Sequence, residues 1–171
     1  MKKSIVICFG LLAVMFFMSV YVYPHLPETV ASHWNVHGEA DGYMPKFWGT
    51  FLLPLISIGL LGLFLGLPRI DPLRANLIAF QRYYYGFVVL MMGFFNYLQV
   101  IILLWNLGFV FPFTQLFILP IAVLFVYIRV LLKHSKQNWF VGIRTPWTLS
   151  NEQVWTRTSQ LGSQLFTIAG I

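Results

Sequence analysis

Charged residues are scarce in this sequence of 171 residues. They make up 9% of the chain, with 11 lysines and arginines against 5 acids. An average soluble domain has roughly 25% charged residues. So few charges cannot cover the surface of a soluble particle of this size, which argues against a soluble enzyme.

Cysteine is almost absent, since Cys8 is the only one. This excludes an internal disulfide framework and any metal site built from cysteines alone. Apolar residues are abundant instead, at 58%, whereas disordered chains are poor in them. The net charge of +6 would suit a nucleic acid, but the basic residues are few and scattered among apolar runs. The anionic inner surface of a membrane is a better partner, and we expect no direct contact with nucleic acid.

Four apolar stretches are long enough to cross a bilayer, which requires about 20 residues. They are predicted at about 4–23, 47–67, 83–106 and 109–132. A fifth stretch, 161–171, is too short to cross, so it either lies partway in the membrane or belongs to a chain that continues. The predicted fold is therefore an all-α integral membrane protein, with residues 1–171 forming a single polytopic domain.

The positions of the basic residues predict the orientation of these spans. A cytoplasmic N-terminus leaves Lys46 alone outside the cell. The loop at 24–46 is then extracellular and the loop at 133–160 is cytoplasmic. Ten basic residues then lie on the inner side: Lys2, Lys3, Arg69, Arg74, Arg82, Arg129, Lys133, Lys136, Arg144 and Arg157.

The central parts of the spans contain no ionisable side chain. Proton-coupled pumps and many ion carriers place such groups there, so their absence disfavours a transporter. Asn96 and Gln99 are the most polar residues of the third span. We expect both amides to hydrogen-bond neighbouring helices, because an unsatisfied amide in hydrocarbon is costly.

The 24–46 loop contains a possible metal site. His33 and His37 are spaced i, i+4, and Glu39 or Asp41 could add an oxygen ligand. The alternative is a compact loop whose polar groups hydrogen-bond its own turns. The chain has no H-E-x-x-H motif, G-x-S-x-G motif or other nucleophile–base arrangement. We therefore expect no enzyme activity and no cofactor.

The same loop carries a recognisable pattern. Residues 26–46 read L-P-x-x-V-x-x-H-W-N-x-x-G-x-x-D-G-Y-x-x-K, which resembles the N-terminal signature of the SdpI immunity-protein family. His37 falls at a variable position of that pattern. The resemblance implies a toxin-facing loop whose candidate residues are His33, Trp34, Asn35, Gly38, Asp41, Gly42 and Lys46.

The 133–160 loop carries a second pattern. Residues 138–150 read N-W-F-V-G-I-R-T-P-W-T-L-S, followed by V-W-x-R-T at 154–158, and this resembles the C-terminal signature of the same family. A capping box of Ser150 and Gln153 predicts a helix start, with Thr148 or Asn151 as alternative caps. The apolar part of the loop either lies against the inner headgroups, packs under the bundle or docks a soluble partner. The candidate partner-binding residues are Asn138, Gly142, Arg144, Thr145, Pro146, Trp147 and Trp155.

The resemblance implies a bacterial, multi-pass protein of the cell membrane. The founding member of that family protects its producer from a secreted, membrane-active killing peptide and holds a cytosolic repressor at the membrane. We therefore expect immunity or signalling, with the bilayer, a toxin peptide and a repressor as partners. The alternative is a membrane transporter or metal-binding protein that uses His33, His37 and Asp41 for capture, and a membrane enzyme acting on lipid headgroups ranks last.

Overall fold

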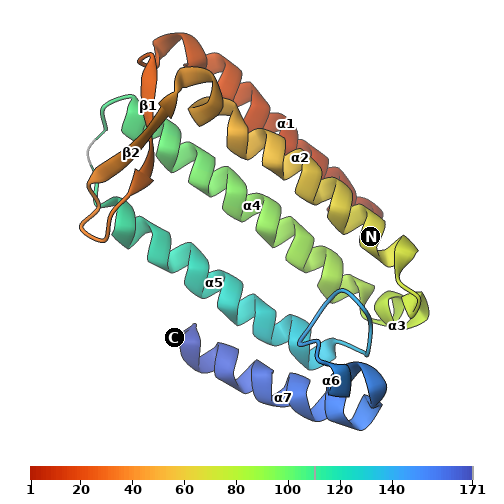
Figure 1. The fold of residues 1–171 in the computed structure, drawn as a ribbon. Coiled ribbons are helices and arrows are strands. Elements are labelled where there is room, and N and C mark those ends of the chain that lie inside the picture. The colour runs from red at the N-terminus through yellow and green to blue at the C-terminus, as the bar shows by residue number, and fades with distance from the viewer. Residues whose placement is uncertain (110, 171) are drawn as a thin grey trace.

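The computed structural model describes residues 1–109 and 111–170, and four long helices dominate it. They are α1 (Lys2–Val22), α2 (Lys46–Ile70), α4 (Gln81–Asn106) and α5 (Phe113–His134). All four are long and apolar enough to cross a membrane, and they run side by side along the molecule (Figure 1). The predicted fold class, a helical membrane protein with four spans, is confirmed.

Helix α4 is the centre of the bundle, because it packs against α1, α2 and α5. Its buried face includes Tyr84, Val88 and Met92, which meet Cys8 of α1 and Leu61 of α2 in one apolar core. The remaining faces of the helices expose many apolar side chains. That distribution suits helices surrounded by lipid rather than by water.

One of the two mid-span amides behaves as predicted. The Gln99 amide Nε2 donates to Ser19 Oγ of α1 at 2.8 Å and to the Thr50 carbonyl of α2 at 2.9 Å. Asn96 instead donates to Met92 of its own helix at 3.0 Å, so the expectation of a bond to a neighbouring helix is wrong for that residue. Gln99 therefore joins the three helices of the core through hydrogen bonds.

The 24–46 segment adds a small sheet to the helical fold. After a short 3-10 helix, η1 (Tyr23–His25), strands β1 (Thr29–Trp34) and β2 (Ala40–Pro45) form an antiparallel hairpin. The hairpin lies across one end of the bundle, which we call the hairpin end (Figure 1). It packs there through Val30, which lies in an apolar cluster with Leu26 and Leu103, and the adjacent Ala31 is buried as well.

The opposite end holds the N-terminus and the second motif, and we call it the N-terminal end (Figure 1). It contains α3 (Arg74–Ala79), the loop 135–145, α6 (Pro146–Ser150) and the start of α7 (Glu152–Ala169). Helix α7 then runs back along α5, since Gly162 lies beside Leu132 and Gly170 beside Ala122 and Val126. The rings of Phe166 and Phe125 meet edge to face at 5.4 Å.

Two boundary predictions in this region need correction. The stretch 161–171 is not a separate short apolar segment, because residues 161–169 form the second half of α7. Helix α7 begins after Asn151, whose side-chain oxygen accepts from the Gln153 and Val154 amides. The predicted Ser150–Gln153 capping box is therefore wrong, and the Asn151 alternative is correct. An actual capping box starts α6, between Thr145 and Thr148.

Candidate functional site

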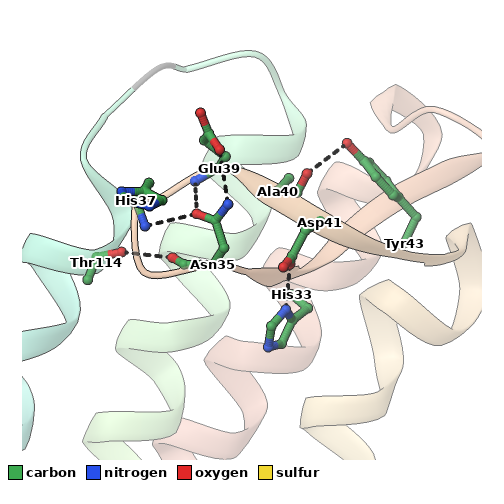
Figure 2. A network of polar contacts seen from close by, with 8 residues as sticks. All are labelled: His33, Asn35, His37, Glu39, Ala40, Asp41, Tyr43 and Thr114. Carbon is green, nitrogen blue, oxygen red and sulfur yellow. Dashed lines mark hydrogen bonds and ion pairs between the residues drawn. The ribbon is translucent and has the colours of Figure 1, made fainter.

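Asn35 organises the turn of the hairpin (Figure 2). Its Oδ1 accepts from the amides of His37 at 2.9 Å and Glu39 at 3.0 Å, and its Nδ2 donates to Glu39 Oε2 at 3.0 Å. Gly38 closes the turn with a φ of 81°, a conformation that favours glycine. Two residues of the first motif thus serve the local fold of the turn.

His33 and Asp41 face each other across the two strands, where the His33 ring contacts the Asp41 carboxylate (Figure 2). Both side chains are largely exposed. Gly42 permits this approach, because a Cβ there would lie 2.8 Å from His33 Cβ. His37 is not part of the pair. Within residues 1–109 and 111–170, no group of three His, Cys, Asp or Glu side chains could hold a metal ion. Of the three residues proposed for metal capture, only His33 and Asp41 are therefore in contact.

Polar contacts attach the hairpin to the helices. Asn106, at the end of α4, accepts from the Ala31 amide at 2.7 Å and donates to the Ala31 carbonyl at 3.0 Å. Lys46 lies 3.7 Å from Glu28 and over the Tyr23 ring, 5.0 Å from its centroid. The sequence analysis missed Asn106, although an amide directly after a long apolar run is a signal that could have identified it.

Trp34 stacks flat on Phe113, with ring centroids 3.8 Å apart, and meets Trp105 edge to face at 5.9 Å. Beside this cluster is a cavity of about 430 Å³, between the hairpin and the ends of α4 and α5. Trp34 Nε1 is buried and has no hydrogen-bond partner among the described residues. We call the cavity the hairpin groove; it is lined by Ser32, His33, Trp34, Asn35, Val36, Leu98, Ile102, Phe113, Thr114 and Phe117.

At the N-terminal end, Asn138 holds the loop together. It is fully buried. Its Nδ2 donates to the carbonyls of Lys136 and Val141, both at 2.8 Å, and its Oδ1 accepts from the amides of Phe140 and Val141. Every polar atom of this side chain is therefore paired within the loop, and Asn138 presents nothing to a partner.

Four further residues of the second motif are also structural. Gly142 has a φ of 120°, and a Cβ there would lie 3.0 Å from the Trp155 ring. Trp155 is 1% exposed and donates to the Ser135 carbonyl at 3.3 Å. Thr145 caps α6, and Pro146 occupies the first position of that helix, where its missing N–H is no loss.

Arg144 and Trp147 are candidate partner-binding residues whose large side chains remain exposed. Trp147 is 70% exposed. The Arg144 guanidinium is also exposed, and one of its nitrogens donates to the Trp139 carbonyl at 2.8 Å. Trp139 itself is 48% exposed. These three side chains form an aromatic and cationic surface, which we call the Trp147 surface.

The loop is also tied to α3 and to the segment just before it by two residues that were not among the predicted site residues. Asp71 is 3% exposed, and its carboxylate accepts from the Leu73 and Trp139 amides. Asn76 donates to the Gln137 carbonyl at 2.8 Å. These contacts join segments more than 60 residues apart, so no local pattern could have indicated them.

Comparison with known proteins adds to this geometry. Residues 134–171 match the model of the SdpI/YfhL protein family, and residues 10–58 match a domain of unknown function, DUF1648. The chain is 24% identical to Immunity protein SdpI of Bacillus subtilis (strain 168) over 170 residues, which are 99% of this chain and 79% of that protein. The resemblance to the SdpI family is confirmed.

The two matched regions fall at opposite parts of the fold. The DUF1648 match covers most of α1, the hairpin and the first half of α2, whereas the SdpI/YfhL match covers the loop after α5 with α6 and α7. No solved structure matches the chain. The protein is therefore a multi-pass membrane protein related to an immunity protein, and the SdpI relative is named for immunity rather than for a catalytic activity.

Proposed function

We propose that this protein is a bacterial membrane immunity protein that protects its cell from a secreted, membrane-active peptide. The similarity to Immunity protein SdpI over 99% of the chain supports this proposal. The observation that carries it is the hairpin groove, an aromatic cavity at one end of a membrane bundle. A peptide approaching along the membrane surface would reach such a cavity without entering the bundle.

The distribution of basic residues supports an outward-facing hairpin. Lys2, Lys3 and Arg144 belong to the N-terminal end, and Lys46 is the only lysine or arginine near the hairpin. Cytoplasmic loops of membrane proteins carry the excess of lysine and arginine. The N-terminal end therefore faces the cytoplasm in this proposal, and the hairpin faces the secreted peptide.

The chemistry of the hairpin groove suits a membrane-active peptide. Leu98, Ile102 and Phe117 supply apolar walls, which would bury an apolar side chain at roughly 25 cal/mol per Å². Trp34 lines the same groove, and its buried N–H has no partner among the described residues; in this proposal the side chain turns on binding, so that the N–H donates to a carbonyl oxygen of the bound chain. A buried donor without a partner costs about 1–3 kcal/mol, so a ligand that pairs with it recovers that free energy.

The test compares two substitutions by phenylalanine on the same hairpin, each of which replaces an aromatic side chain that carries a polar hydrogen. Trp34→Phe keeps an aromatic ring against Phe113 and removes the N–H, whereas Tyr43→Phe removes a polar hydrogen outside the groove. Cells are challenged with the killing peptide against which the founding member protects. We expect Trp34→Phe to lower the tolerated peptide concentration about fivefold, equivalent to about 1 kcal/mol of binding. Equal survival of both variants and wild type, at equal membrane abundance, would contradict the proposal.

At the other end, the Trp147 surface is proposed to hold a cytosolic repressor. Tryptophan and arginine are enriched among the residues that dominate protein interfaces. Trp147 and Arg144 are exposed, whereas Asn138 and Trp155 of the same motif are buried. In this proposal the buried residues shape the loop and the exposed ones contact the partner.

A double variant, Arg144→Ala with Trp147→Ala, tests this second part. We expect the membrane-bound fraction of the repressor to fall, while the cells still survive the challenge with the killing peptide. Val154→Ala, on an exposed position of α7, is the matched control. Normal repressor recruitment by the double variant, at normal abundance, would remove the Trp147 surface from the mechanism.

A further inference from the structure

A second cavity, of about 640 Å³, lies between α5 and α7 and is separate from both motif surfaces. Arg129 and Lys133 line it from α5, and Gln160, Ser163, Gln164 and Thr167 line it from α7 together with Ile168. No acidic residue is in its lining. We call this cavity the α5–α7 groove.

The two cations of the groove stand on one face of α5. Residues four apart on a helix lie above one another, so Arg129 and Lys133 present their charges together. Neither has a carboxylate within ion-pairing distance in the described part of the chain. The two neighbouring positive charges favour a bound anion, because no acidic side chain of the groove lining neutralises them.

The polar side of the groove has the same regularity. Residues 160, 163, 164 and 167 are spaced i, i+3, i+4 and i+7, which places them on one face of α7. Gln160 and Gln164 are exposed, while Ser163 is buried and its carbonyl accepts from Thr167 Oγ1 at 2.8 Å. The two glutamine amides can therefore donate to oxygens of a ligand.

The depth of the groove distinguishes a lipid from a soluble anion. Helix α5 ends at His134, so Arg129 lies about 7.5 Å inside that end at about 1.5 Å per residue. Helix α7 continues alongside to the middle of α5 (Figure 1), and Ile168 lines the deeper part of the cavity. The two cations thus lie toward the N-terminal end of the groove, and Ile168 lies toward the middle of α5.

We infer that the α5–α7 groove binds the headgroup of an anionic phospholipid. Arg129 and Lys133 contact the phosphate, since a guanidinium matches phosphate oxygens in a bidentate way. Gln160 and Gln164 donate to headgroup hydroxyls or ester carbonyls, and the acyl chains follow Ile168. Basic pockets between membrane helices are suited to anionic lipid headgroups, and this inference does not depend on the proposed immunity function.

The experiment measures lipid retained by the full chain in detergent, by native mass spectrometry, with phosphatidylglycerol and phosphatidylcholine in equal amounts. We expect wild type to retain phosphatidylglycerol preferentially. Arg129→Gln with Lys133→Gln should lower that retention about tenfold or more, since each cation near an anionic lipid contributes about 1 kcal/mol. Lys2→Gln with Lys3→Gln removes the same charge elsewhere and should leave retention unchanged.

Two further variants keep the test decisive. Gln160→Leu with Gln164→Leu preserves both cations, and it should lower retention of phosphatidylglycerol about threefold, as expected for a lost neutral hydrogen bond. Arg129→Lys keeps the charge and should retain more lipid than Arg129→Gln. If the double cation variant does not fold, as judged by its thermal unfolding, the glutamine variant decides.

Several results would overturn the inference. An equal loss of phosphatidylglycerol in the Arg129/Lys133 variant and in the Lys2/Lys3 variant would mean that general surface charge retains the lipid. Equal retention of phosphatidylcholine and phosphatidylglycerol by the wild type would exclude recognition of the anionic headgroup. Displacement of the lipid by millimolar glycerol phosphate would point to a soluble phosphate instead. A wild-type dimer that the Arg129 and Lys133 variant separates, with lipid retention unchanged, would assign the groove to a second copy of the chain.

Discussion

The two motif-bearing regions differ in how their signature residues are used. At the N-terminal end, Asn138 and Trp155 are buried, and both are hydrogen-bonded into the loop. At the hairpin end, the Asn35 side chain bonds only within its own turn, and His33 and Asp41 pair in an exposed position. The motif at the N-terminal end is thus mainly a folding device, whereas the motif at the hairpin end combines residues that shape the turn with an exposed His33–Asp41 pair. The residues to test for function differ accordingly.

The largest expected effect separates two tryptophans of one motif. Trp155→Ala removes a ring that is 1% exposed, and large-to-small changes of this kind cost about 3–5 kcal/mol. We expect a marked fall in the thermal unfolding midpoint of the purified protein. Trp139→Ala, at 48% exposure, is the control, and an equal fall in both variants would contradict the division between buried and open residues.

A pair of glycines compares the two ends directly. Gly142 has a φ of 120° beside the Trp155 ring, whereas Gly108, at the hairpin end, has a φ of 92° and nothing among the described residues within 4 Å of a built Cβ. Alanine at either site carries backbone strain of about 1–3 kcal/mol. Gly142→Ala should destabilise more, because it adds a clash to the strain. Equal unfolding midpoints for the two variants would show that the 135–145 loop accommodates a side chain as easily as the turn at Gly108.

A smaller effect is expected at the hairpin turn. Asn35→Leu removes three side-chain hydrogen bonds at a half-buried position. Because water can replace part of them, we expect about 1–2 kcal/mol of local destabilisation. Hydrogen exchange of the β1 and β2 amides should accelerate while α4 keeps its protection. A global drop in stability would mean that the hairpin supports the bundle more than its contacts indicate.

The smallest change in stability is expected for Trp147→Ala. Its ring is 70% exposed, and substitutions of this kind usually change stability by less than about 0.5 kcal/mol. Thermal unfolding of the variant should overlay that of the wild type. A large destabilisation would place Trp147 among the structural residues of the motif, next to Trp155, and would leave Arg144 and Trp139 to form the proposed surface.

Local pattern predicted the parts of the site that depend on local chemistry. The cap at Asn151, one of three that the sequence allowed, is of this kind, because a short polar side chain before a helix acts within a few residues. The choice between buried and exposed tryptophans could not be predicted in the same way. Trp147 and Trp155 have the same chemistry, and only the packing of α7 distinguishes them.

By itself the amino-acid sequence determined the four membrane spans, since a long run of apolar residues has no stable alternative to a helix in lipid. It also shows two motifs that resemble those of the SdpI family, one in the loop after the first span and one in the loop after the fourth. Only the tertiary structure decided that residues 29–45 pair as a hairpin and that α7 folds back along α5. The place of the hairpin on the bundle depends on contacts such as Asn106 with Ala31, and that of α7 on contacts such as Gly162 with Leu132. Their free energy comes from both partners together, so it cannot be assessed from either segment alone.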